Sequence, residues 1–207
     1  RHPRLVSDWS SDVCSSDLMT NPLKIAIRGA GVAGLWQALT LARRGHGVAI
    51  VERSVEPFVD ACSPYAGAML APRCEEESAE AVIRELGTRG IALWQATYPD
   101  LMTHGSLVVA APRDRSLLDR VARRTKEPTR LDGSALAALE PELAPRFGSA
   151  LYYEDEALVN PNTALSFLLR AVQEAGVQVH FGVGDMPQGD DNVLDCRGHA
   201  PKDALPT

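Results

Sequence analysis

Several features that would assign a chain to a special class of protein are scarce in this sequence. The four cysteines are far apart and form no Cys-x-x-Cys pair, which argues against a zinc site or a disulfide framework and is typical of a reducing cytoplasm. No apolar run approaches the roughly 18 residues that a membrane span needs. The formal net charge of −6 argues against nucleic acid or an anionic membrane surface as a partner. We therefore expect a cytoplasmic protein with no membrane span, no nucleic-acid partner and no metal ion.

The rest of the composition is ordinary for a globular protein, with 45% hydrophobic and 23% charged residues. The first residues differ, because Arg1–Leu18 is rich in Ser and Asp and has no periodic apolar pattern or signal-peptide core. Its part Val6–Leu18 resembles a translated sequencing adapter, and Met19 follows as a natural start. We interpret residues 1–18 as a non-native or disordered tail without function.

A strand–helix–strand pattern follows this tail. Lys24–Arg28 is a short apolar run that predicts a buried strand, and Val48–Val51 predicts a second one. Between them, Val32–Arg44 places its apolar residues on one helical face, and Gly45 stands where a helix ends. Such a unit predicts two parallel strands joined by a right-handed crossover.

The turn that leads from the first strand into the helix is rich in glycine. Its residues are Gly29, Ala30, Gly31, Val32, Ala33 and Gly34. The first glycine allows a tight turn, the second lets the backbone approach a pyrophosphate, and the third lets the helix pack closely on the strand. The helix N-terminus then offers N–H groups and a partial positive charge to a diphosphate.

An acidic residue, Glu52, ends the second strand 23 residues after Gly29, where a carboxylate accepts hydrogen bonds from the adenosine ribose. A carboxylate at this position would repel the 2′-phosphate of NADP. The sequence therefore predicts a dinucleotide site, but this unit alone does not distinguish FAD from NAD.

A second segment bears on that choice. Cys62–Pro72 reads CSPYAGAMLAP and resembles a loop of the D-amino-acid-oxidase-like (DAO) flavoproteins, in particular the glycine oxidases of the thiamine pathway, whose loops contain AGGMLAP runs. Weaker likeness extends from Met19 to the end of the chain. It includes the runs LEPEL at 139–143, ALYY at 150–153, VNP at 159–161 and DCRG at 195–198.

The resemblance implies FAD as the cofactor. Carried over by position, residues 29–34 would contact the diphosphate, Glu52 and Arg53 the adenosine, and a backbone segment around Val183–Met186 the adenine. The residues implied near the ribityl chain and the isoalloxazine ring are Cys62, Ser63, Gly67, Ala68 and Met69.

The resemblance also implies an activity: oxidative deamination of glycine or a small amino acid or amine, with hydride transfer to the flavin and release of peroxide when oxygen is the electron acceptor. In this family an Arg and a Tyr of the C-terminal half hold the substrate carboxylate. We expect that half to be missing here, so that the chain is an N-terminal part, its catalytic residues are unknown and it is inactive by itself. A homo-oligomer is possible.

Other readings remain open at this point. Within the same superfamily, sarcosine-oxidase-like and D-amino-acid-dehydrogenase-like enzymes fit as well. Outside it, the dinucleotide unit also fits an NAD-linked dehydrogenase, and the chain could be a catalytically incomplete nucleotide-binding module. No local side chains suggest a nucleophile. We interpret Tyr152 and Tyr153 as strand packing and Glu75–Glu77 as the solvated start of a helix.

The fold class that we predict is α/β. A Rossmann-like FAD-binding domain with a parallel sheet would comprise residues 19–87 and 160–207, and an incomplete α+β substrate domain residues 88–159. Within these, Glu76–Thr97 predicts a helix interrupted near its two glycines, and Ala150–Tyr153 and Ala157–Val159 predict strands that could pair with each other. Asn160-Pro161 is expected to begin a late helix.

Overall fold

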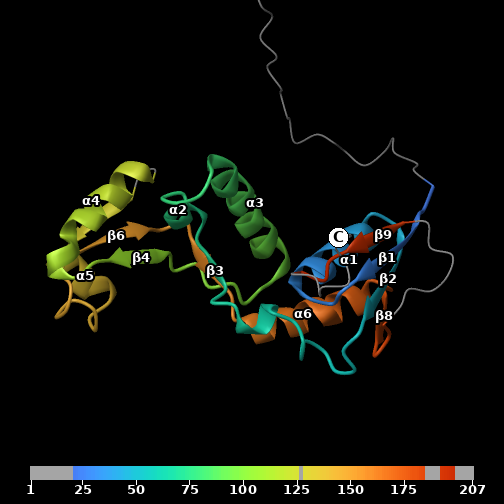
Figure 1. Ribbon diagram of the computed structural model, residues 1–207. Coiled ribbons are helices and arrows are strands. Elements are labelled where there is room, and N and C mark those ends of the chain that lie inside the picture. Colours follow the sequence, from blue (N-terminus) through green and yellow to red (C-terminus); the bar gives the residue numbers. More distant parts are fainter. Residues whose placement is uncertain (1–20, 126–127, 185–191, 199–207) are drawn as a thin grey trace, which may run out of the picture. The chain divides into compact units, whose positions relative to one another are not determined.

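The structure is a computed structural model that describes residues 21–125, 128–184 and 192–198, and Figure 1 shows its helices and strands. The chain divides into two compact units. The first comprises Arg1–Pro57 and Val172–Thr207, and the second comprises Phe58–Ala171. The expected bounds of an FAD-binding and a substrate domain stay a prediction.

The first unit contains a four-stranded sheet in the order β8-β2-β1-β9, and every neighbouring pair is parallel. Its strands are β1 (Lys24–Arg28), β2 (Gly47–Glu52), β8 (Gln178–Phe181) and β9 (Val193–Asp195). The strand β1 lies between β2 and β9, and its three middle residues are buried. Its continuous apolar run is the pattern that a central parallel strand, covered on both faces, requires. The predicted α/β class with a parallel sheet is confirmed.

Helix α1 (Val32–Arg43) connects β1 to β2 and completes the predicted βαβ unit. It buries one stripe of residues, which comprises Gly34, Leu35, Ala38 and Leu39. The helix ends at Arg43, one residue before the predicted end, because Arg44 and Gly45 form a tighter closing turn. The nitrogen of Gly45 donates to the carbonyl of Ala42 at 2.9 Å, and Gly45 has φ +85°, a conformation that favours glycine.

The second unit contains two small antiparallel sheets. One has the order β4-β6-β5, and the other pairs β3 with β7. These strands are β3 (Met69–Leu70), β4 (Ser106–Val109), β5 (Thr129–Asp132), β6 (Ser149–Tyr153) and β7 (Ala157–Leu158). The expectation that β6 and β7 pair with each other is wrong. Because β4 and β5 already occupy both edges of β6, that strand offers no free edge, and β7 pairs with β3 instead.

The core beside β6 supports the interpretation of the two tyrosines as packing residues. The side chain of Tyr153 is fully buried with Leu118 and Leu151, and its hydroxyl lies 2.7 Å from the hydroxyl of Thr125. The hydroxyl of Tyr152 donates to the carbonyl of His104 at 3.0 Å. Both phenol groups therefore have structural partners.

Four helices and two short 3-10 turns accompany these sheets. They are η1 (Ser63–Tyr65), α2 (Pro72–Glu75), α3 (Ala81–Thr97), η2 (Pro112–Asp114), α4 (Arg115–Arg124) and α5 (Gly133–Leu139).

Helix α3 is continuous, so the expected interruptions at Gly87 and Gly90 are wrong. A glycine inside a helix costs only about 1 kcal/mol relative to alanine, which packing readily offsets. At Gly87 the missing side chain has a packing reason, because a Cβ there would lie 2.5 Å from the Cβ of Pro72. Gly87 therefore permits the close approach of α3 to α2.

The prediction that the acidic cluster Glu75–Glu77 is the solvated start of a helix is wrong. Glu75 ends α2, and α3 begins only at Ala81. The carboxylate of Glu76 lies 3.0 Å from Nε of Arg84, and that of Glu77 lies 3.0 Å from Nε of Arg120. Two of these three carboxylates thus form ion pairs with neighbouring helices.

Helix α6 (Pro161–Glu174) begins as predicted. The side-chain oxygen of Asn160 accepts hydrogen bonds from the nitrogens of Asn162 and Thr163, at 3.1 and 3.3 Å, and so caps the helix. Glycine follows the helix at Gly176, where φ is +83°. In the described ranges, no helix is long and apolar enough to span a lipid bilayer.

Candidate functional site

The bend after β1 is built by Gly29. Its φ of +99° lies in the region that favours glycine, and its nitrogen donates to the carbonyl of Val51 at 2.9 Å. A Cβ at this position would lie 2.8 Å from the carbonyl oxygen of Cys196, in the residue that follows β9. A larger residue would therefore meet both a backbone penalty and a backbone clash.

The third glycine of the motif, Gly34, places helix α1 directly against this bend. A Cβ on Gly34 would lie 1.9 Å from the carbonyl oxygen of Gly29, which no backbone can accommodate without moving. The predicted role of this glycine in close helix–strand packing is confirmed. The approach fixes where the N-terminus of α1 lies relative to the end of β1.

The N-terminus of α1 opens at Gly31, the helix cap residue, which has extended backbone angles (φ −73°, ψ −178°) and no side chain to hydrogen-bond to the helix. The first helical hydrogen bond runs from the nitrogen of Leu35 to the carbonyl of Gly31 at 3.0 Å. The N–H groups of Ala33 and Gly34 precede that bond, at the positive end of the helix dipole. The first turn of α1 contains no acidic residue that would repel an anion.

Glu52 also lies at this bend, although it is the last residue of β2 and is distant from the glycine motif in the sequence. Its Oε2 accepts a hydrogen bond from the nitrogen of Ala30 at 2.9 Å, and its Oε1 accepts one from the nitrogen of Ser54 at 3.1 Å. The residue is half-buried, while the neighbouring Arg53 is exposed. The motif and its acid, which the sequence predicts as one site, are thus brought together in the first unit.

The end of β9 lies on the other side of the bend. The nitrogen of Cys196 donates to the carbonyl of Arg28 at 2.8 Å. The guanidinium of Arg197 donates to both carboxylate oxygens of Asp195, at 2.9 and 2.6 Å, and holds the pKa of that carboxyl down to about 2. The positive charge of Arg28 adds to the same lowering. The DCRG run therefore packs against the bend at Arg28 and Gly29.

The segment after β8 runs beside Glu52. The nitrogen of Val183 donates to the carbonyl of Glu52 at 3.0 Å, and that of Gly182 to the carbonyl of Ser54 at 2.8 Å. The predicted adenine-contacting segment begins at this Val183, whereas Asp185 and Met186 lie outside the described residues.

The predicted flavin loop belongs to the second unit. Cys62, which is exposed, precedes the η1 turn, and Gly67 and Met69 are exposed as well. Ala68 has φ +52°, a left-handed conformation that L side chains rarely adopt, and its carbonyl accepts a hydrogen bond from the nitrogen of Val159 at 3.1 Å. Ala68 stands where the AGGMLAP runs have their second glycine.

One residue at this loop was not predicted. The side chain of Glu156 is buried and accepts hydrogen bonds from the backbone nitrogens of Arg73 and Cys74, both at 2.8 Å. The local sequence does not indicate a buried residue at this position. Glu156 is the last of three consecutive acids in Glu154–Glu156, and such a run usually indicates a solvated turn. Across the described residues, no group of three or more His, Cys, Asp and Glu side chains is suited to hold a metal ion.

Comparison with known proteins identifies the family. The sequence profile of the DAO family, described as FAD dependent oxidoreductase, matches residues 24–200. The chain belongs to this family. The assignment confirms the resemblance seen in the glycine motif and in the Cys62–Pro72 loop, and it favours FAD over the NAD-linked alternative.

A curated relative of this DAO-family chain comes from Rhizobium etli, and its name assigns it to thiamine biosynthesis as an oxidoreductase (ThiO). The two proteins are 42% identical over 186 residues, which make up 89% of this chain and 57% of the relative. The chain therefore spans little more than half the length of that protein.

Solved structures share the fold. Glycine oxidase from Geobacillus kaustophilus matches with a TM-score of 0.65 at 23% identity, over 77% of this chain and 47% of the other. Glycine oxidase from Bacillus cereus matches with a TM-score of 0.64 at 22% identity, over 81% and 49%. L-alpha-glycerophosphate oxidase from Mycoplasma pneumoniae, solved with FAD bound, gives 0.60 at 20% identity, over 77% and 44%.

Proposed function

We propose that this chain is the nucleotide-binding part of a flavoenzyme that oxidatively deaminates glycine or another small amino acid or amine. The observation that carries the proposal is the position of the Glu52 carboxylate, 2.9 Å from the backbone nitrogen of Ala30 in the glycine bend. The name of the Rhizobium etli relative and the fold shared with glycine oxidases support the substrate class and a place in thiamine biosynthesis.

The groups at the bend fit the ADP half of FAD. The positive end of α1 and its first N–H groups suit a diphosphate, because they supply hydrogen-bond donors without a side chain in the way. Each oxygen of the Glu52 carboxylate accepts one hydrogen bond from the backbone, from Ala30 or from Ser54. A carboxylate oxygen has a further lone pair, so both oxygens can also accept a hydrogen bond from a ribose hydroxyl.

The remaining assignments follow the same logic. When bound, FAD supplies the oxidation chemistry as the acceptor of a hydride from the substrate carbon. We assign residues 29–34 to the diphosphate, Glu52 and Arg53 to the adenosine, and the loop around Met69 to the ribityl chain and the ring. In that loop we assign Cys62, Ser63, Gly67, Ala68 and Met69. Four of these five residues are small and Met69 is exposed, so few bulky side chains would obstruct a planar ring.

We assign no catalytic residue to this chain. The resemblance implies a substrate-binding Arg and Tyr in the C-terminal half of the enzyme, and this chain spans 57% of the relative. We propose that the 207-residue chain is therefore inactive, whereas the full-length enzyme uses oxygen or another electron acceptor. A homo-oligomer and a cytoplasmic location, consistent with the free thiols of Cys62, Cys74 and Cys196, belong to the same proposal.

The full-length protein provides the test. We expect a yellow preparation with the two absorption bands of a bound flavin, and peroxide release when glycine or a small amine is added in air. The 207-residue chain should release none. A colourless full-length protein that binds NADH would contradict the cofactor assignment. A yellow protein that oxidises no amino acid or amine would contradict the substrate assignment alone.

A further inference from the structure

We propose that Glu156 is a positioning residue that fixes the backbone of the Cys62–Pro72 loop, and so sets the geometry of the surface that meets the flavin ring. The inference rests on the proposed function, because it takes this loop as the flavin-contacting one. Glu156 itself is a buried residue that would not touch the cofactor.

Glu156 makes three contacts with the residues that follow the loop. Its Oε1 accepts hydrogen bonds from the nitrogens of Arg73 and Cys74, both at 2.8 Å, and its Oε2 lies 3.1 Å from the Sγ of Cys74. Only 1% of Glu156 is exposed. A buried carboxylate is costly unless it is fully hydrogen-bonded, and all three donors come from the two residues that follow Pro72. Glu156 therefore fastens the point where the loop ends.

The backbone that continues from Glu156 also binds the loop. In the next strand, β7, Ala157 pairs with Leu70 and Leu158 pairs with Met69. One residue further, the nitrogen of Val159 donates to the carbonyl of Ala68 at 3.1 Å. The four residues 156–159 thus contact the loop at Ala68, Met69 and Leu70, and also the two residues that follow it, Arg73 and Cys74.

These contacts maintain a strained backbone conformation at Ala68. Ala68 has φ +52°, and a non-glycine residue keeps such a conformation only where its surroundings over-determine it. Gly67 and Met69 on either side of it are exposed. The loop therefore holds a strained backbone at the position proposed for the ring, and the contacts of segment 156–159 are what holds it there.

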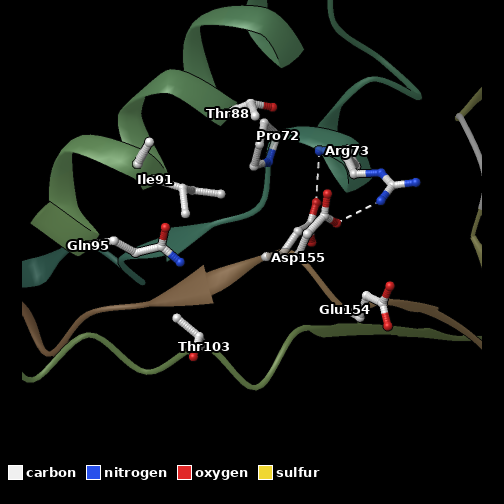
Figure 2. Close-up of a pocket in the computed structure, with 10 residues that line it drawn as sticks. Pro72, Arg73, Thr88, Ile91, Gln95, Thr103, Glu154 and Asp155 are labelled. Atoms are coloured by element: carbon white, nitrogen blue, oxygen red, sulfur yellow. Dashed lines mark hydrogen bonds and ion pairs between the residues drawn. The ribbon is translucent and has the colours of Figure 1, made fainter.

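A neighbouring ion pair shows the contrast with an ordinary surface contact. Arg73 Nη1 lies 2.7 Å from Asp155 Oδ1, beside a pocket of about 250 Å³ that Ile91 and Gln95 also line (Figure 2). The side chain of Asp155 is 54% exposed, so solvent screens this pair. Buried Glu156 has no such competition from water, which makes it the more effective anchor.

The reactivity of the Cys74 thiol depends on its contact with Glu156. Burial and the hydrogen bond to Glu156 raise the pKa of Cys74 above its usual range, so the thiol stays protonated and continues to donate. A neutral amide at position 156 would keep an oxygen for the two backbone nitrogens, but it would lose the carboxylate that faces the sulfur.

The experiment compares Glu156→Ala, Glu156→Gln and the control Glu154→Gln in the full-length protein with FAD. Glu154 belongs to the same acidic turn and is exposed. Hydrogen exchange is measured on the peptide that spans residues 66–74, together with the visible flavin spectrum and the rate of Cys74 alkylation. We expect Glu156→Ala to speed amide exchange in this peptide at least tenfold and to shift the flavin bands.

The other variants make the result specific. Glu156→Gln should restore the spectrum and most of the amide protection while Cys74 alkylates faster, and Glu154→Gln should match the wild type in all three measurements. Unchanged exchange in Glu156→Ala overturns the anchor. Faster exchange with an unchanged spectrum overturns its role at the flavin. If Glu156→Ala does not fold, unchanged Cys74 alkylation in Glu156→Gln overturns the anchor.

Failure of the proposed function gives a different pattern. A wild-type protein that binds no flavin refutes that function and the flavin role of Glu156 with it. The exchange data would still report whether Glu156 fastens the loop, because they need no cofactor.

Discussion

The carboxylate of Glu52 and the backbone nitrogen of Ala30 are joined by a hydrogen bond of 2.9 Å. This contact ties the end of the second strand to the glycine bend at the end of the first. Because the acid is already at the bend, no rearrangement of the strands is needed to bring a ribose-binding group beside a diphosphate-binding one.

A first prediction concerns the charge of that acid. Glu52→Gln keeps the shape of the side chain but removes the negative charge, and hydrogen bonds to a charged group contribute roughly 1.5–3 kcal/mol. We expect the affinity for FAD to fall about 10- to 100-fold, measured by flavin fluorescence titration of the apoprotein. The exposed Glu56 of the same unit provides the control, and Glu56→Gln should bind FAD like the wild type. An unchanged affinity in Glu52→Gln would mean that the acid does not contact the ribose.

A second prediction concerns helix packing at the bend. Gly34→Ala puts a Cβ 1.9 Å from the carbonyl oxygen of Gly29, so the helix must move away from the strand. We expect the free energy of unfolding to fall by about 3 kcal/mol, together with loss of FAD binding. The matched control is Gly90→Ala on α3, where no atom lies within 4 Å of the added Cβ. It should raise the free energy of unfolding by about 0.5–1 kcal/mol.

Denaturant unfolding of both alanine variants measures this difference. Equal stability of Gly34→Ala and the wild type would show that the close approach of α1 to the bend is not required.

A third prediction concerns the strained loop residue. Ala68→Gly removes a left-handed penalty of about 1–2 kcal/mol and adds a smaller entropy cost of about 0.5–1 kcal/mol. We therefore expect a small gain in the free energy of unfolding. Ala66→Gly is the matched control, because Ala66 has φ −71° and gains nothing from glycine. Its melting temperature should fall while that of Ala68→Gly rises, and the same sign for both would contradict the strain at Ala68.

A fourth prediction concerns the thiols and pH. The pKa of Cys74 is raised, first by burial and then by the hydrogen bond to Glu156, whereas Cys62 is exposed. At pH 8 we expect iodoacetamide to modify Cys62 much faster than Cys74, as measured by mass spectrometry of the intact fold. Equal rates would show that the Cys74 thiol is not held in this contact.

The raised pKa of Cys74 also makes the stability of the fold depend on pH. A thiol whose pKa is higher in the folded state contributes its full stabilisation below the unfolded-state pKa, and the contribution is lost as the pH rises above about 9. The melting temperature of the wild type should therefore fall more steeply above that pH than the melting temperature of Cys74→Ala.

The sequence predicts the first unit well because its signals are local. Gly29, Gly34 and Glu52 have roles set by a turn, a close approach and a strand end, and each can be recognised from residue type and spacing. The cap at Asn160 is local in the same way. Assignment of the residues to FAD rather than NAD required the resemblance of the second loop.

The second unit was harder to predict because its contacts join distant residues. The pairing of β7 with β3 depends on β6 having both edges occupied, which no short segment reveals. Glu156 illustrates the same limit, since its hydrogen bonds to Arg73 and Cys74 span more than eighty positions of the chain. The close packing of α3 against Pro72 at Gly87 is equally invisible in the sequence.

The most direct test of the central claim is a crystal structure of the full-length protein with FAD. The account predicts diphosphate oxygens within hydrogen-bond distance of the backbone nitrogens at the N-terminus of α1, and the adenosine ribose hydroxyls on the carboxylate of Glu52. A diphosphate bound elsewhere, with Glu52 still holding only Ala30 and Ser54, would contradict it.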